Sequence, residues 1–375
     1  MFKNFDLKLF FIFLIILIFI QFSYQFNLLN IYNLNFSFND LKYSGSNLFL
    51  ENENIYEIYF NDPFDKRIKY SQYPNYSITS IYFHLPLGFF SFDLAKIIWR
   101  IFTIILLAHT YIILSNLDLE TKNQNFIIFF SMIILIISKP FNVLINTGNF
   151  SIVCFWAYIF FFIGKKYNIF ISLLISSIKY SFAPILIFYA FYKKNFLQIF
   201  LVILFTIFLL SHFSYKFDYD FIKLMIAPLQ IGASSTASGF LDFQTLLGNH
   251  PNNEILRYLL LFLLSFSFFY FILNKTNRSG LFDLSIVSIL TILFFKHLYY
   301  DVVFLLPTLI YSFKIKSKYK YTLILVILYY WFVAYLDIFE FFKYWKTFIL
   351  FNNILLVACL SILIFTNLKY KNIEI

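Results

Sequence analysis

The 375-residue sequence is poor in charged residues. Asp, Glu, Lys and Arg make up 13% of it, hydrophobic residues make up 61%, and the mean hydropathy is +0.77. Soluble domains average about 25% charged residues. The composition therefore excludes a soluble protein. It predicts an all-α polytopic membrane protein in which residues 1–375 form a single integral domain within a lipid bilayer.

Cysteine is also scarce, and several catalytic motifs are missing. The two cysteines, Cys154 and Cys359, lie in separate apolar runs, which excludes a disulfide framework and the spacing of zinc ligands. The sequence contains no GxGxxG, Walker, GxSxG or HExxH pattern. ATP-driven transport and serine or zinc hydrolysis therefore have no support, and no metal and no cofactor are expected.

Positive charge exceeds negative charge, with 29 Lys and Arg residues against 19 Asp and Glu residues. The lysines lie in short loops beside apolar runs, which is the positive-inside pattern of membrane proteins. This placement argues against nucleic acid as a partner. It also orients the chain, because basic loops prefer the cytoplasmic side.

Apolar runs of roughly 20 residues or fewer, oriented in this way, predict about twelve membrane segments with both termini cytoplasmic. Two long loops, at about 25–90 and 213–254, then lie outside and carry part of the active site, and the predicted location is the plasma (inner) membrane. The predicted segments are 9–24, 91–114, 126–138, 152–163, the two halves of 167–194, 196–212, 256–273, 281–295, 302–313, 321–336 and 347–366.

The segment 167–194 is the most informative of these. It carries Lys179 near its middle, and a pair of lysines lies at each end, at 165–166 and at 193–194. If both pairs are cytoplasmic, the segment is a short helical hairpin with Lys179 at its outer turn. Inserting an ammonium group deep in a bilayer costs about 2.5–3.5 kcal/mol. A lysine there is therefore expected to bind an anionic group, with snorkelling or pairing to a carboxylate as the alternatives.

Other polar residues are predicted at the same outer face. Asp40 follows the first segment, and a carboxylate near an apolar surface can act as a general base. Lys296 and His297 together can bind a phosphate, and Gly148–Asn149 opens a segment whose backbone N–H groups can receive an anion. The alternatives are a solvated loop acid, an interfacial belt and an ordinary turn, respectively. Further candidates for substrate contacts are His84, His250 and Tyr299.

Several short motifs follow one another between about residues 36 and 313. They are DLKYSGSNLFLENENIY from Asp40, YFHLPLGFFSFDLAKIIWRI with Trp99 and Arg100, Gly148–Asn149, Lys179 followed by Pro184, and His297-x-Tyr299 before a run ending at Pro307. In this order they resemble glycosyltransferase family 87, the polyprenol-phosphate-dependent mannosyltransferase-like proteins of the GT-C class. Gly45 is displaced from the family pattern, and Asn149 stands where the family has Gln.

The resemblance implies a GT-C-like fold and a hexosyltransferase activity. A mannose-like hexose would pass, with inversion, from a polyprenyl-phosphate-linked donor to a glycan or glycolipid acceptor at the extracytoplasmic face. Asp40 would be the general base, and Lys179, Lys296 and His297 would bind the donor phosphate. The alternatives are a flippase or transporter for a lipid-linked sugar and a polysaccharide polymerase or ligase. Whether Glu51, Glu57 or Asp62 assists Asp40 is left open.

Overall fold

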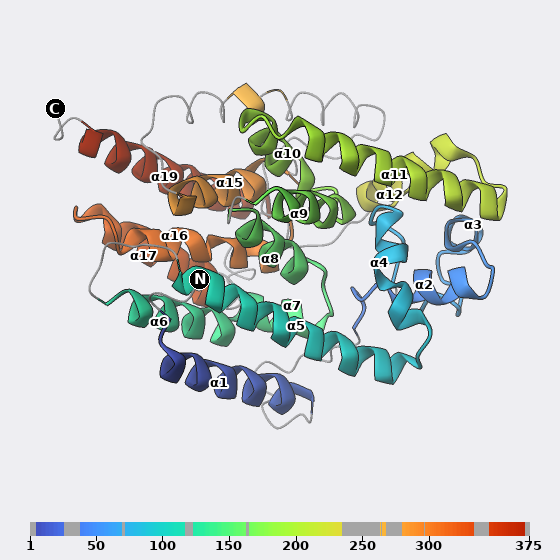
Figure 1. Cartoon of the computed structure of the whole chain (residues 1–375), viewed down its shortest axis with the longest axis horizontal. Helices are drawn as coiled ribbons and strands as arrows, with labels where there is room; N and C mark the ends of the chain where they lie inside the picture. Colours follow the sequence, from blue (N-terminus) through green and yellow to red (C-terminus); the bar gives the residue numbers. More distant parts are fainter. Residues whose placement is uncertain are drawn as a thin grey trace.

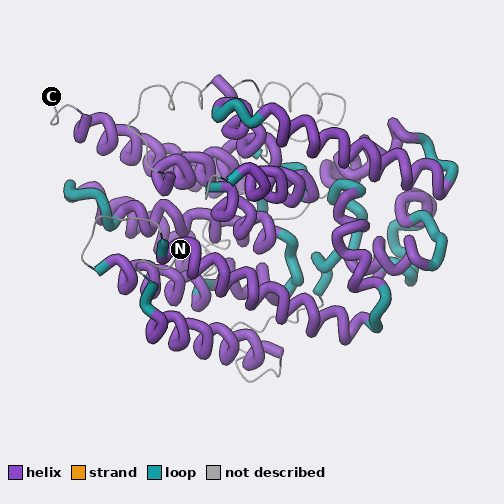
Figure 2. The backbone as a smooth tube through the Cα atoms, viewed as in Figure 1, coloured by secondary structure: helices purple, strands orange, loops and turns teal. Residues whose placement is uncertain are grey.

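The computed structural model describes residues 5–25, 38–69, 72–116, 123–162, 165–234, 263, 265–267, 280–295, 297–333 and 345–371. Regular secondary structure in these ranges is helical (Figure 2), so the all-α prediction is confirmed. Figure 1 shows the longer helices side by side along the long axis of the molecule, with α2, α3 and α4 gathered at one end.

The described helices have the following bounds. They are α1 (Leu7–Gln25), α2 (Tyr43–Leu50), α3 (Ile55–Asn61), α4 (Thr79–Gly88), α5 (Phe92–Ser115), α6 (Gln124–Ile137), α7 (Lys139–Asn146), α8 (Ser151–Phe161), α9 (Lys166–Ile178), α10 (Ala183–Tyr192), α11 (Phe196–Phe217), α12 (Phe221–Ser234), α15 (Gly280–Phe294), the 3₁₀ helix η3 (Tyr299–Leu305), α16 (Leu306–Ser312), α17 (Tyr319–Leu328), the π-helix η4 (Tyr329–Val333) and α19 (Trp345–Lys371).

Three described helices are long and apolar enough to cross a membrane. They are α5, α11 and the part of α19 from Ile349 to Asn367, and a fourth crossing results if α6 and α7, which meet at 63°, form one broken span. The twelve membrane segments predicted from the sequence are not supported. The chain has the expected apolar runs, but most of them form helices such as α8, α9 and α10, with 11, 13 and 10 residues. At 1.5 Å per residue, such helices are shorter than the ~30 Å hydrocarbon layer.

Local sequence signals explain the breaks between helices. Ser138 is extended, and its hydroxyl accepts a hydrogen bond from the backbone N–H of Phe141, so it caps α7 just where α6 ends. Pro140 occupies the first turn of α7, where its missing N–H costs nothing. The predicted segment 302–313 is likewise split, because a 3₁₀ turn ends at Leu305 and Pro307 lies in the first turn of α16. The predicted segment 256–273 lies largely outside the described residues.

The predicted hairpin is present, with its break at Lys179. The backbone leaves α9 at Lys179, and α10 begins four residues later. The start of α8 contacts this turn, whereas the ring of Phe162, just after α8, lies 4.9 Å from the ring of Tyr189 at the far end of α10. The lysine pairs at 165–166 and 193–194 therefore lie at one end of the hairpin, and Lys179 lies at the other.

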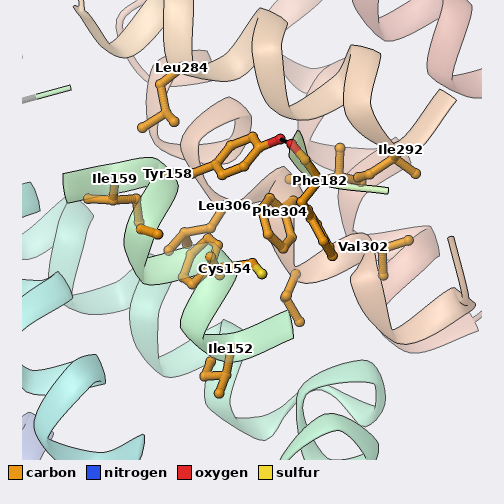
Figure 3. Close-up of a cluster of buried hydrophobic side chains, with 14 of the residues drawn as sticks. Ile152, Cys154, Tyr158, Ile159, Phe182, Leu284, Ile292, Val302, Phe304 and Leu306 are labelled. Carbon is orange, nitrogen blue, oxygen red and sulfur yellow. Dashed lines mark hydrogen bonds between the residues drawn. The ribbon is translucent and has the colours of Figure 1, made fainter. Parts of the chain in front are cut away.

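A buried aromatic cluster packs against the turn between α9 and α10 (Figure 3). The rings of Phe182 and Phe304 stack with 4.6 Å between centroids, and Tyr158 meets Phe304 edge to face at 5.1 Å. The Tyr158 hydroxyl donates to the backbone carbonyl of Phe182 and lies 2.9 Å from the Thr291 hydroxyl. These contacts fix the turn against α8, α15 and η3, so the position of Lys179 is set by the core.

Candidate functional site

Lys179 is the centre of a buried polar cluster. Only 8% of the residue is exposed, and its Nζ donates to the Ser151 hydroxyl at 2.6 Å. The same Nζ lies 3.2 and 3.3 Å from the two carboxylate oxygens of Asp301, which is fully buried. Two residues distant in sequence thus form an ion pair, which is the arrangement a buried charge requires.

His297 completes this ion pair from the second side. Its Nδ1 lies 2.8 Å from Oδ2 of Asp301, four residues further along the chain. The turn that begins η3 brings the two side chains together. Lys179 therefore has a protein counter-ion, and His297 contacts that counter-ion rather than standing alone as a phosphate ligand. The sequence analysis had considered a carboxylate partner for Lys179 but not for His297.

Asp40 lies in the same region and is partly exposed. Its backbone N–H donates to the carbonyl of Thr147 at 3.0 Å, and its Oδ2 accepts a hydrogen bond from Asn149 at 2.9 Å. The hydroxyl of Tyr300 lies 3.5 Å from the same oxygen. The Asn149 side chain also accepts from the backbone N–H of Ser151, which contacts Lys179. The structure thus brings Asp40, Asn149 and Lys179 together, as predicted, and Asn149 orients the carboxylate.

Gly148 shapes the backbone beside Asp40. Its φ of +67° is a left-handed conformation, which glycine adopts without strain. A Cβ atom at this position would lie 2.7 Å from the Phe38 ring and 3.0 Å from Cβ of Leu41. Gly148 therefore allows the loop of Asp40 to approach closely, which is a different role from the predicted anion contact.

Lys42 and Tyr76 also belong to the cluster, and the sequence analysis missed both. Lys42 is 5% exposed, donates to the carbonyl of Tyr73 at 3.1 Å, and has its Nζ 4.5 Å from the centre of the Tyr76 ring. Nζ of Lys179 lies 6.0 Å from the same ring. Two ammonium groups thus lie near one tyrosine. The signal available in the sequence was position, since Lys42 follows Asp40 by two residues.

The charges of the cluster influence one another. Burial lowers the pKa of Lys42 to about 8, the negative charge of Asp40 raises it, and the positive charge of Lys179 lowers it. Lys42 lies just before α2, outside the candidate membrane spans. Burial therefore has the largest effect on this pKa, and the charges of Asp40 and Lys179, both predicted site residues, act on it in opposite directions.

Two further connections hold the loops that carry this cluster. The Gln72 side chain donates to the carbonyl of Phe38 at 2.9 Å and accepts from the backbone N–H and hydroxyl of Ser44 at 2.8 Å. The backbone N–H of Ser77 donates to the carbonyl of Ile178, directly before Lys179. The long loop after α1 is thereby attached to the hairpin turn.

The remaining predicted residues lie at the edge of the cluster, in other surroundings or outside the described ranges. His84 is buried at the edge, with its ring 5.1 Å from that of Trp99 and 5.6 Å from that of Phe150, and its Nδ1 2.7 Å from the carbonyl of Ser80. Tyr299 is buried in η3, next to Tyr300. Lys296 and His250 lie outside the described residues. Within the described ranges, no group of three or more His, Cys, Asp or Glu residues is arranged to hold a metal ion.

The cluster combines a partly exposed carboxylate, Asp40, with two buried ammonium groups, an imidazole and the buried carboxylate of Asp301. A carboxylate can accept a proton, and ammonium groups can stabilise an anion in a site of low polarity. No family model, no curated protein and no solved structure matches the chain. Function therefore has to be argued from the site.

Proposed function

We propose that the protein is a membrane glycosyltransferase that transfers a mannose-like hexose from a polyprenyl-phosphate-linked donor to a hydroxyl group of a glycan or glycolipid acceptor. The observation that supports this most is the proximity of a partly exposed carboxylate, Asp40, to two buried lysines, Lys42 and Lys179. Transfer from a lipid phosphate requires a proton acceptor and positive charge for the leaving group.

Each group has a defined part in this proposal. Asp40 takes the proton of the acceptor hydroxyl while the hydroxyl oxygen attacks the anomeric carbon of the sugar. The bond between that carbon and the phosphate oxygen breaks, and the electron pair leaves with the phosphate. Attack from the face opposite the phosphate inverts the anomeric carbon. Asn149 holds the Asp40 carboxylate in place for this step.

The lysines would stabilise the leaving phosphate. The ammonium group of Lys179 already faces Asp301, so the charge it offers to a ligand is partly compensated. Lys42, with its hydrogen bond to a backbone carbonyl, is the second cation next to Asp40. His297 contacts Asp301, the counter-ion of Lys179, and so would position that carboxylate.

The location of the site supports extracytoplasmic chemistry. Lys179 lies at the end of the hairpin opposite to the lysine pairs at 165–166 and 193–194. Because lysine-rich loops prefer the cytoplasm, the Lys179 end would face outward. A lipid-linked donor reaches such a site from within the bilayer, which suits a plasma-membrane enzyme.

Replacement of Asp40 tests the proposal. In purified protein reconstituted in nanodiscs, with radiolabelled polyprenyl-phosphate-mannose as donor and a membrane glycolipid extract as acceptor, Asp40→Asn is expected to lower transfer by about 10²–10⁴-fold. Binding of the donor should persist. Asp93→Asn, an exposed carboxylate paired with Lys96, is the matched control and should retain activity. Full activity in Asp40→Asn would overturn the assignment, and donor translocation without transfer would favour a transporter.

A further inference from the structure

We propose that a second site, a polar cleft between the α3 region and the end of α11, binds a neutral carbohydrate chain. The cleft has a volume of about 660 Å³. It is lined by nine residues between Asn52 and Arg67, in and around α3, and by residues 215–218 at the end of α11. Cavities of about 300–1,000 Å³ are the usual size for small-molecule ligands. This cleft is separate from the cluster around Asp40.

Tyr215 gives the cleft its aromatic platform. It lies in the last turns of α11, and 90% of it is exposed. An aromatic ring presents a negative face, against which the weakly positive C–H groups of a sugar ring can pack. A tyrosine exposed to this extent beside a polar cavity is available to a ligand, unlike the buried Tyr56 of α3.

Exposed residues in and after α3 supply hydrogen-bonding groups to the cleft. The lining includes the exposed amides Asn52 and Asn61 and the exposed carboxylates Glu57 and Asp62. Amides donate and accept, and carboxylates accept, so together they match the hydroxyl groups of a sugar. Sites for drug-sized ligands are usually lined by apolar side chains, whereas this cleft is lined mainly by polar ones. Such a lining favours a polyhydroxylated ligand.

The charge of the cleft argues against an anionic ligand. Its positive groups are already engaged: Arg67 bonds to Glu53 at 2.8 Å and Asp65 at 2.7 Å, and Nζ of Lys216 donates to the carbonyl of Phe49 at 2.7 Å. Carboxylates outnumber these two cations along the lining. The cleft therefore differs from the lysine-containing cluster around Asp40, and a phosphate or acidic sugar would meet repulsion.

Helix α2 connects the two sites. Asp40 lies just before its first residue, Tyr43, and Asn52 of the cleft lies just after its last residue, Leu50. Eight residues of helix rise about 12 Å. The hydrogen bond from Lys216 to the carbonyl of Phe49 joins the end of α11 to the end of α2. On the proposed function, the glycan held in the cleft is the acceptor.

Binding of a linear neutral manno-oligosaccharide tests the cleft. Isothermal titration calorimetry of the full chain in nanodiscs should show binding that Tyr215→Ala weakens by about tenfold and that Tyr215→Phe preserves. Tyr321→Ala, which removes an exposed tyrosine on α17, is the matched control and should bind like the wild type. The phosphorylated form of the same oligosaccharide should bind more weakly than the neutral one.

Other outcomes overturn the inference. Unchanged binding in Tyr215→Ala would show that the ring does not contact the ligand. Calcium binding abolished by Glu57→Gln, with no oligosaccharide binding, would make the cleft a cation site. The inference and the proposed function fail separately. Asp40→Asn should still bind the oligosaccharide, and loss of cleft binding with Asp40-dependent transfer intact would remove only the cleft.

Discussion

Lys42 keeps its positive charge in surroundings that work against it. Burial lowers its pKa to about 8, so its ammonium form predominates below that pH and is lost above it. On the proposed function, the affinity for the lipid-phosphate donor should therefore fall as the pH rises through about 8. In Lys42→Met the donor KM should be raised about tenfold or more and should lose this pH dependence. Donor KM measured across a pH range bracketing that value checks the expectation.

The matched control for Lys42 keeps the charge at every pH. The guanidinium group of Lys42→Arg stays protonated, so donor binding should no longer fall near pH 8. The wild-type protein should show the opposite trend in stability: its free energy of unfolding should rise with pH while its affinity for the donor falls. Because the folded pKa lies below the ordinary value of 10.5, the unfolded chain binds more protons between the two values, and stability should rise with pH there. An unchanged pH profile in Lys42→Met would exclude Lys42 from donor binding.

Single residues were predicted where their chemistry conflicts with their surroundings. Lys179 in an apolar segment and Asp40 next to one could be recognised from the sequence, and the structure places both in one cluster with Asn149. Lys42 could not be recognised, because a lysine in a polar loop is ordinary until folding buries it. His84 was predicted at the site, and its imidazole is buried at the edge of the cluster, packed on Trp99 and Phe150. Composition alone does not separate a histidine in the core from one in a site.

The contact between the hairpin turn and η3 depends on a buried pair of charges. Removing one partner leaves the other charge buried and uncompensated, which typically costs 3–5 kcal/mol. Asp301→Asn should therefore lower the free energy of unfolding by about that amount, measured by denaturant titration in mixed micelles. Lys179→Met combined with Asp301→Leu should recover most of the loss, because no isolated charge remains.

A solvent-exposed ion pair on α5 provides the comparison for the buried pair of Lys179 and Asp301. Lys96 and Asp93 lie 2.6 Å apart at the start of α5, and the Asp93 side chain is largely exposed. Water screens such a pair, so Asp93→Asn should change the free energy of unfolding by less than about 1 kcal/mol. Equal stability of Asp301→Asn and the wild type would mean that the buried pair does not hold the turn.

The positions of the helices were predicted better than which of them can cross a membrane. Apolar runs located α5 and α6 to within two residues at each end and the start of α11, whose last five residues were missed because they are more polar. The count of twelve crossings was not supported. The same apolar composition suits a helix that faces lipid and a helix that is buried by other helices. Helices α8, α9 and α15 are apolar but short, and their buried residues pack against other helices. Burial by neighbours, which the sequence does not record, makes short helices possible.

At the scale of the molecule, the position of lysines should fix the orientation in the membrane. The 13 residues of α9 rise about 20 Å, less than the ~30 Å hydrocarbon layer, so on the proposed orientation the turn at Lys179 would lie within that layer if residues 165–166 lie at its cytoplasmic face. A membrane-impermeant maleimide applied to intact cells should label Phe64→Cys, which replaces an 83% exposed residue of the loop after α3, but should leave Lys166→Cys and Lys193→Cys unlabelled until the membrane is permeabilised. The native Cys154 and Cys359 are fully buried and give no background.

Labelling of Lys166→Cys and Lys193→Cys in intact cells would reverse the orientation and place the Asp40 cluster on the cytoplasmic side. Labelling of only one of them would contradict the hairpin itself, because both ends would then not share one face of the membrane.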